Sequence, residues 1–195
     1  MQREIKQEGK LLDENGVLTQ TGYAKSLILD YSRDQIKAAK HRIKEWDYYL
    51  VYNDSFALAL TVADNSYMSL LSASLLDFDS LFQQTTGQMA AFPMGRLRLP
   101  KSSVSGVTQG RSKKSRFQFI TENGSTTLLC HMDNFKDKKP LDAEIRLFDR
   151  PRDSMVIATP FDGDKKAFYY NQKIIGMRAE GKAVFDGREY RFDPK

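Results

Sequence analysis

Short apolar runs separated by turn signals follow one another from residue 46 to the end of the chain, and this pattern constrains the fold most. The runs are rich in aromatic and β-branched residues, while Asn, Asp, Gly and Ser lie between them, as is typical of strands joined by short turns. We expect about ten strands, a number that usually curls into a barrel or splits into a sandwich. The sequence therefore predicts an antiparallel all-β fold.

The first of these runs, "EWDYYLVY" at residues 45–52, carries aromatic side chains on both faces. Side chains alternate along a strand, so one face receives Trp46, Tyr48, Leu50 and Tyr52. The other face receives Asp47, Tyr49 and Val51. After a turn at Asn53, "SFALALTVAD" is the expected partner strand, with large apolar residues on one face and only Ala and Thr on the other.

Two further local signals concern a turn and a helix. Asn123 and Gly124 separate two apolar runs, and Asn-Gly is a strong hairpin signal because both residues tolerate a positive φ. Residues 30–45 place Ile36, Ala39 and Ile43 at spacings of three and four, which predicts one short helix or a helical turn. Residues 100–116 are polar and are expected to form a loop or a weak hairpin.

The composition is that of an ordinary folded domain. The 195 residues are 41% hydrophobic and 28% charged, with a net charge of +5, and a chain of this length can bury a sizeable core. We expect a single β domain over residues 1–195, made of an N-terminal segment (1–45) and an antiparallel meander (46–195). The polar start, the absence of a long apolar run and the lone Cys130 favour a cytoplasmic location.

Few residues carry a recognisable chemistry. Cys130 and His131 are adjacent and point to opposite faces of a strand, so they cannot converge on one metal ion or act as nucleophile and base. Asp77 and Asp79 share a face if their strand continues, but aspartates are also common in turns. No phosphate-binding glycine loop or nucleophile elbow is found, and we expect no cofactor and no metal.

The basic run of Arg111, Lys113, Lys114 and Arg116 suggests a surface for an anionic partner. Phe117 and Phe119 follow it and could stack on bases. Their strand spacing fits core residues better, so nucleic acid is the less favoured partner. The many tyrosines and phenylalanines suit either an apolar ligand cavity or a filled barrel core, and the sequence leaves both open.

Two segments are informative when they are considered together: "LLDENGVLTQTGYAKSLILDYSRDQIKAAKHRIKEWDYYLVYND" at residues 11–54 and "PFDGDKKAFYYNQKIIGMRAEGKAVFDGREYRFDP" at residues 160–194. They resemble a bacterial family, the domain of unknown function 2804 proteins. The features that the family shares are an "L...G.L...GYA" start, "RIKEWDYY" and a later "FYYN". Members of that family continue into a tryptophan-rich second half, so the resemblance implies that this chain is the N-terminal half of a longer architecture.

That family is distantly similar to the lipocalin-like carotenoid 1,2-hydratases and tocopherol cyclases. The resemblance implies a lipocalin-like β-barrel, or a strongly curved sheet, that holds a hydrophobic molecule. It also suggests a sheet edge through which two copies could form a homodimer. No catalytic residue of those enzymes matches this chain by motif.

From these observations we predict that the chain binds a small hydrophobic or amphipathic molecule. The predicted aromatic lining consists of Trp46, Tyr48, Tyr49, Tyr52, Tyr169 and Tyr170. Arg178 is the candidate anchor for an anionic head group. Two alternatives remain: a hydratase-like or cyclase-like enzyme in which Asp47 or Asp77 protonates an alkene, and a protein or nucleic-acid interaction module that uses residues 101–116.

Overall fold

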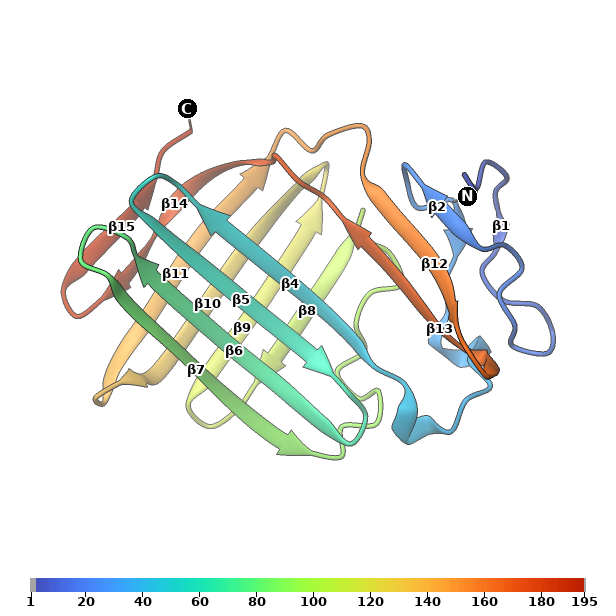
Figure 1. Ribbon diagram of the computed structural model, residues 1–195. Coiled ribbons are helices and arrows are strands. Elements are labelled where there is room, and N and C mark those ends of the chain that lie inside the picture. Colours follow the sequence, from blue (N-terminus) through green and yellow to red (C-terminus); the bar gives the residue numbers. More distant parts are fainter. Residues whose placement is uncertain (1–2, 195) are drawn as a thin grey trace. The chain divides into compact units, whose positions relative to one another are not determined.

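The computed structural model describes residues 3–194, which form two compact units (Figure 1). The larger unit contains residues 40–149 and 178–194, and the smaller unit contains residues 3–39 and 150–177. Each unit has its own sheets and its own apolar cluster, and each is therefore described separately.

A four-stranded antiparallel sheet forms one layer of the larger unit. Its strands, in spatial and chain order, are β4 (Glu45–Tyr52), β5 (Phe56–Asp64), β6 (Met68–Asp77) and β7 (Phe82–Ala91). The predicted turn at Asn53 joins β4 to β5: its side-chain Oδ1 accepts hydrogen bonds from the N–H groups of Ser55 and Phe56, both at 3.0 Å. Asparagine favours this conformation because its side chain can replace a main-chain acceptor.

A six-stranded antiparallel sheet forms the other layer, in the order β15-β14-β11-β10-β9-β8. Its strands are β8 (Gly106–Arg111), β9 (Ser115–Glu122), β10 (Ser125–Lys136), β11 (Lys139–Phe148), β14 (Arg178–Phe185) and β15 (Arg188–Phe192). Asn123 and Gly124 join β9 to β10 with φ values of 50° and 76°. The hairpin predicted from this dipeptide is confirmed.

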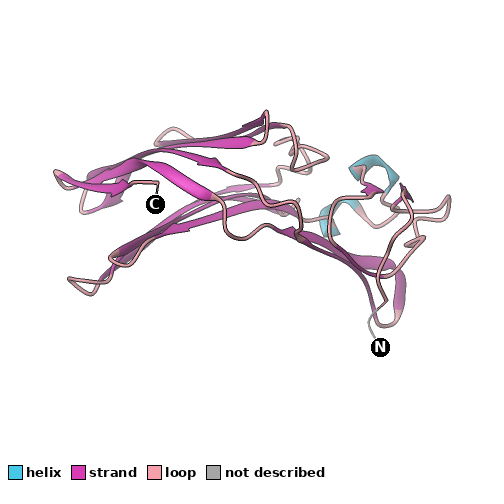
Figure 2. Ribbon diagram, turned by 90° about the horizontal axis from the view of Figure 1, so that it is seen from above, coloured by secondary structure: helices cyan, strands magenta, loops and turns pink. Residues whose placement is uncertain are grey.

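The two sheets face each other as a sandwich, and Figure 2 shows the strands of this unit in two layers. Aromatic side chains cross between the layers: Phe56 lies 5.2 Å from Tyr190 and 4.8 Å from Phe192, measured between ring centroids. Burial alternates along β9, β10 and β11, as expected for strands with one face in a core. Phe117 and Phe119 are fully buried there.

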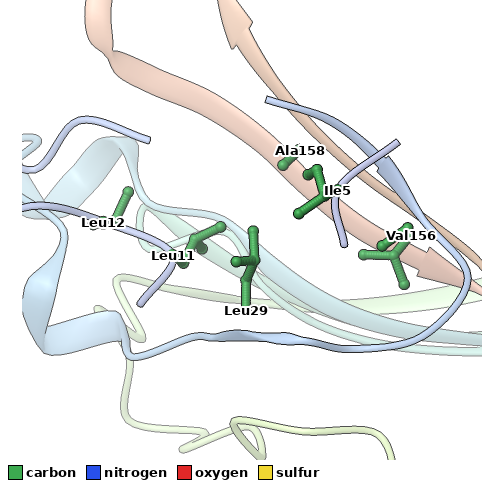
Figure 3. Close-up of a cluster of buried hydrophobic side chains, with 7 residues drawn as sticks. Ile5, Leu11, Leu12, Leu29, Val156 and Ala158 are labelled. Carbon is green, nitrogen blue, oxygen red and sulfur yellow. The ribbon is translucent and has the colours of Figure 1, made fainter. Parts of the chain in front are cut away.

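The smaller unit is built on a three-stranded sheet in the order β13-β12-β2. Its elements are β1 (Gly9–Lys10), β2 (Gly22–Ala24), β3 (Leu29–Asp30), β12 (Met155–Phe161) and β13 (Asp164–Lys173). Strands β1 and β3 form a short parallel pair. Figure 3 shows the apolar cluster that holds the unit together; its labelled members are Ile5, Leu11, Leu12, Leu29, Val156 and Ala158.

The predicted all-β antiparallel fold is confirmed, but the predicted barrel is not found, because none of the sheets over residues 3–194 closes on itself. The strands split instead into the sandwich of the larger unit and the separate sheet of the smaller one. No helix within the same residues is long and apolar enough to cross a membrane.

The continuous helix predicted over residues 30–45 is not found, whereas the alternative of a helical turn is. This stretch contains only two single-turn 3-10 helices, Arg33–Gln35 and Lys40–Arg42. The apolar spacing was misleading because its members serve different cores: Ile36 packs against the cluster of the smaller unit, whereas Ile43 is buried in the larger unit. A common helix face would have required one core for both side chains.

The meander expected from residue 46 onward is interrupted twice. It runs from β4 to β7 in one sheet and from β8 to β11 in the other, because β7 does not pair with β8. Strands β12 and β13 leave for the smaller unit, and the chain returns in β14 to pair with β11. The expected hairpin near residues 100–116 is present as β8 paired with β9. The single-domain organisation stays a prediction.

Candidate functional site

The outer face of the four-stranded sheet carries the largest exposed apolar residues of the larger unit's strands. Because β4 pairs with β5 in register, Trp46, Tyr48, Leu50 and Tyr52 form one row along this face. Their exposed fractions are 39%, 55%, 50% and 69%. Met89 of β7 lies on the same face and is 70% exposed. We call these five residues the aromatic face.

Strand β5 contributes only small side chains to this outer surface. They are Ala57, Ala59, Thr61 and Ala63, which lie directly opposite the row on β4. On the next strand, Leu70 pairs with Ala63 and Leu76 pairs with Ala57. A strip of small residues therefore separates the aromatic row of β4 from the leucines of β6. Its alanines are at most 9% exposed, so the larger side chains beside them cover most of the strip.

The predicted aromatic lining is divided among different surroundings. Trp46, Tyr48 and Tyr52 belong to the aromatic face, but Tyr49 points inward and packs edge-on against Phe119, with 5.0 Å between ring centroids. Tyr49 is thus part of the sandwich core rather than of an open cavity.

The two remaining tyrosines of that prediction belong to β13 of the smaller unit. The hydroxyl of Tyr170 donates a hydrogen bond to the carbonyl oxygen of Leu29 at 3.0 Å. The ring of Tyr170 stacks on that of Tyr31, with 6.4 Å between the ring centroids. Burial raises the pKa of Tyr170 to about 12. Its neighbour Tyr169 is half-buried. Tyr170 therefore has a structural role in holding β13 against the chain near Leu29.

Asp47 lies on the inward side of β4, an edge strand, and its carboxylate accepts a hydrogen bond from the hydroxyl of Thr108 on β8. Strand β8 is the edge of the facing sheet. Burial raises the pKa of Asp47, the Thr108 hydrogen bond opposes this, and the charge of Glu45 adds to it. Asp47 is therefore an acid that holds its proton more strongly than an ordinary aspartate.

The pKa of Asp77 is shifted in the opposite direction, below its ordinary value. It is 2% exposed, and its carboxylate accepts hydrogen bonds from the N–H groups of Asp79 and Ser80, the guanidinium of Arg188 and the hydroxyl of Tyr190. Burial raises the pKa of Asp77, but Ser80, Arg188 and the Asp79 N–H together outweigh this and hold it below its ordinary value. A carboxylate with this many donors stabilises a turn and is poorly suited to give up a proton. Asp79 is exposed and supplies no second carboxylate in the core.

Arg178, the predicted head-group anchor, is already engaged. Its Nη1 lies 3.4 Å from an Asp149 carboxylate oxygen, and its guanidinium lies 5.4 Å from the ring centroid of Phe148. All three residues are at the end of the β11–β14 pair. The geometry gives Arg178 a local role on the six-stranded sheet, away from the four-stranded sheet that carries the aromatic face.

Cys130 and His131 point to opposite faces of β10, as their adjacency requires. Cys130 is buried, and burial raises the pKa of its thiol well above the ordinary range. His131 is exposed: its Nδ1 lies 2.6 Å from Asp142 and its Nε2 lies 2.8 Å from Asp133. Hydrogen bonds to Asp142 and then Asp133 raise the pKa of His131. Across residues 3–194, no group of three or more His, Cys, Asp and Glu is placed to hold a metal ion.

The basic run lies at the β8–β9 hairpin, where Arg111 and Arg116 are directly opposite each other and exposed. Lys113 and Lys114 occupy the exposed turn between them. The phenylalanines that follow are fully buried and cannot stack on bases. Any anionic partner of this hairpin would have to be held by charge alone.

Sequence reasoning missed two features of the surface. Strand β7, "FQQTTGQMAA", was not predicted, so Met89 was not assigned to the aromatic face. The exposed residues Phe92 and Met94, which follow β7, were also missed. The signal that could have identified these two residues is the presence of large apolar side chains in a stretch rich in Gly, Pro and Arg.

Comparison with protein families tests the family resemblance that residues 11–54 and 160–194 suggested. Residues 2–195 match the family described as "Domain of unknown function (DUF2804)". The chain belongs to the DUF2804 family. Searches of curated proteins and of solved structures found no match. The inference of function from here on depends on the geometry of the DUF2804 chain itself.

Proposed function

We propose that this DUF2804 protein binds a hydrophobic or amphipathic molecule on the aromatic face. The observation that carries the proposal is the exposure of Tyr48, Leu50, Tyr52 and Met89, each half or more accessible on one sheet surface. Contiguous apolar patches on a soluble surface commonly mark binding sites. Tyrosine suits such a site because its ring contacts apolar atoms while its hydroxyl stays hydrated.

The proposal differs from a lipocalin-like site in its location. Between the two sheets the space is occupied by side chains such as Phe117, Phe119, Leu58 and Leu60, all at most 1% exposed. An interior this well filled has no room for a ligand without repacking. The outer face needs no rearrangement, because its side chains already project into solvent.

Trp46 provides a direct test because it is the only tryptophan and lies on the aromatic face. Dodecanoate, titrated below its micelle concentration, is expected to shift the emission of Trp46. Replacing Tyr48 and Tyr52 together by Ser should weaken binding about tenfold or more. Tenfold is about 1.4 kcal/mol, which is less than the roughly 1.5–3 kcal/mol gained by burying one large apolar side chain.

The matched control is Phe161→Ser, which removes a large side chain that is 58% exposed on β12 of the smaller unit. This variant should bind dodecanoate as the wild type does. A Trp46 signal that does not change with dodecanoate, or an equal loss in the control, would remove the aromatic face as the binding surface.

Proton transfer by Asp47 is a second candidate function, favoured by the raised pKa of this carboxyl group and by its partly exposed position between the edge strands β4 and β8. In a hydratase-type reaction Asp47 would give its proton to one alkene carbon, and water would add to the other carbon and return a proton. The buried, hydrogen-bonded Asp77 is not proposed for this role.

Incubation with a linear polyene in heavy water tests the second candidate. Mass spectrometry should find an alcohol that has gained a carbon-bound deuterium with the wild type and none with Asp47→Asn. Absence of this product with the wild type, or its formation by the variant, would exclude Asp47 as the proton donor.

A further inference from the structure

Three loop segments meet at one end of the larger unit: residues 40–44, residues 64–67 between β5 and β6, and residues 92–98 after β7. The hydroxyl of Ser66 donates to the carbonyl oxygen of Ile43 at 2.5 Å. The N–H groups of Phe92 and Met94 donate to the carbonyl oxygens of Tyr67 and Ser66, at 2.9 and 3.1 Å. We call these segments the Asp64 loop cluster.

Asp64 organises the cluster from its centre. Its side chain is fully buried, and Oδ1 accepts a hydrogen bond from the N–H of Ser66 at 2.9 Å. Oδ2 accepts from the N–H of Gly95 at 2.9 Å and, more weakly, from Leu97 at 3.4 Å. One carboxylate thus fixes the turn between β5 and β6 and the loop after β7 to each other.

This anchoring holds bulky residues in an uncommon conformation. Phe92, Met94 and Arg98 have φ values of 52°, 53° and 51°, a left-handed region that large side chains rarely adopt. Such backbone is maintained where the surroundings determine it, and it clusters at functional sites. Here it presents apolar side chains to solvent: Phe92 is 64% exposed, and Tyr67 beside it is 47% exposed.

The side chains around these apolar groups are basic. Exposed cations of the cluster are Lys40, Arg42, Lys44, Arg96 and Arg98. The ammonium of Lys44 lies 5.8 Å from the ring centroid of Tyr67, and Arg96 Nη2 donates to the carbonyl oxygen of Phe92 at 2.5 Å. The only acidic residue of the three segments is the buried Asp64. The exposed surface of the cluster therefore combines apolar and basic side chains, with Lys44 and Arg96 next to the two aromatic residues.

We propose that the Asp64 loop cluster docks onto an anionic lipid bilayer. Phe92 and Met94 would enter the headgroup region, and the surrounding lysines and arginines would contact the lipid phosphates. Peripheral membrane binding combines buried apolar area with attraction of basic residues to anionic lipids, and both are present here. A single-stranded nucleic acid could stack on the exposed rings of Phe92 and Tyr67, but a bilayer is the better fit because it also accepts the side chain of Met94.

Vesicle sedimentation tests this docking with the full chain. The protein should bind vesicles of phosphatidylcholine mixed with phosphatidylglycerol, bind phosphatidylcholine alone weakly, and be released by salt. Replacing Phe92 and Met94 by Asn should weaken binding about tenfold or more, and Asn tolerates the positive φ at both positions. Replacing Lys44 by Gln and Arg98 by Asn should cost about 25-fold, roughly fivefold for each charge.

Leu81→Asn is the matched control. Leu81 is 88% exposed, also has a positive φ of 56°, and lies in the turn between β6 and β7, at the other end of the same sheet. This variant should bind the mixed vesicles as the wild type does.

Three results would overturn the proposal. The first is no binding to the mixed vesicles, and the second is an equal loss in the Leu81 control. The third is tight binding of oligothymidylate that falls in the Phe92 and Met94 variant while vesicle binding does not, which would assign the cluster to nucleic acid. Because the Tyr48 and Tyr52 variant leaves this cluster intact, failure of dodecanoate binding and failure of vesicle binding are separate outcomes.

Discussion

Replacing Asp64 by Ala tests how strongly one buried carboxylate stabilises the larger unit. The change removes the acceptor of N–H groups from Ser66, Gly95 and Leu97. A hydrogen bond to a charged group contributes about 1.5–3 kcal/mol, and the long bond to Leu97 adds little. Two such bonds give roughly 3–6 kcal/mol, of which water regains part because Gly95 is only half-buried. We expect a loss of about 3 kcal/mol.

Two measurements follow from this expectation. Urea unfolding monitored by Trp46 fluorescence measures the free energy of unfolding of the larger unit. In thermal unfolding, a loss of about 3 kcal/mol corresponds to a decrease of roughly 6–12 °C in Tm for a chain of this size. Trypsin reports the loop itself, because Arg96 and Arg98 are exposed cleavage sites that Asp64 holds in place. Cleavage there should become faster in the variant, while cleavage at Lys113, in the β8–β9 turn, should not.

Asp13→Ala is the control for this prediction. Because Asp13 lies in the smaller unit, unfolding of both variants is also followed by circular dichroism, which reports both units. Asp13 Oδ1 also accepts two main-chain N–H groups, those of Asn15 and Val17, both at 2.9 Å, but it is exposed. Water can replace its oxygen, so we expect a loss of about 1 kcal/mol or less. If Asp64→Ala cost no more than Asp13→Ala and left tryptic cleavage unchanged, the argument that burial multiplies the effect of this carboxylate would be refuted.

Three further changes test the electrostatics of the sandwich. Asp47→Asn should raise the free energy of unfolding at neutral pH, because burial raises the pKa of Asp47 and the ionised carboxylate therefore opposes folding. Urea unfolding should show that this gain disappears as the pH falls below about 4. His131→Gln should lower the free energy of unfolding near pH 6 by less than about 1 kcal/mol, since Asp142 raises the pKa of His131 and favours its charged form. The difference between the wild type and the variant should vanish as the pH rises through that raised pKa. Arg116→Glu should stabilise the β8–β9 hairpin by about 0.2–1 kcal/mol in thermal unfolding, because Arg111 would then face an opposite charge.

Local chemistry explains which parts of the fold were predictable. Asn123-Gly124 defines a hairpin because both residues accept positive φ, whatever surrounds them. Strand β7 was missed because its Gln and Thr residues form no apolar run, and only pairing with β6 makes it a strand. The departure of β12 and β13 to the smaller unit depends on contacts with β2, more than 100 residues away, which no local pattern records.

The candidate site was partly predictable for the same reason. Period-two alternation correctly placed Trp46, Tyr48 and Tyr52 on one face of β4 and Tyr49 on the other. Alternation does not reveal which face another sheet will cover, so the inward position of Tyr49 against Phe119 could be known only from the tertiary structure. The left-handed backbone at Phe92 likewise results from long-range hydrogen bonds.

The outer faces of the two sheets differ in their charged residues. On the six-stranded sheet, cross-strand ion pairs cover the surface, such as Arg146 with Glu180 at 3.2 Å and Lys182 with Glu189 at 2.5 Å. On the four-stranded sheet, the outward positions of all four strands contain no charged residue. An exposed, uncharged sheet face promotes association. The chain therefore covers one face with charge and leaves the other uncharged, with large apolar residues along β4 and mainly Ser, Gln and Thr on the middle of β6 and β7. The row on β4 is the part of this uncharged face to which the proposed binding is assigned.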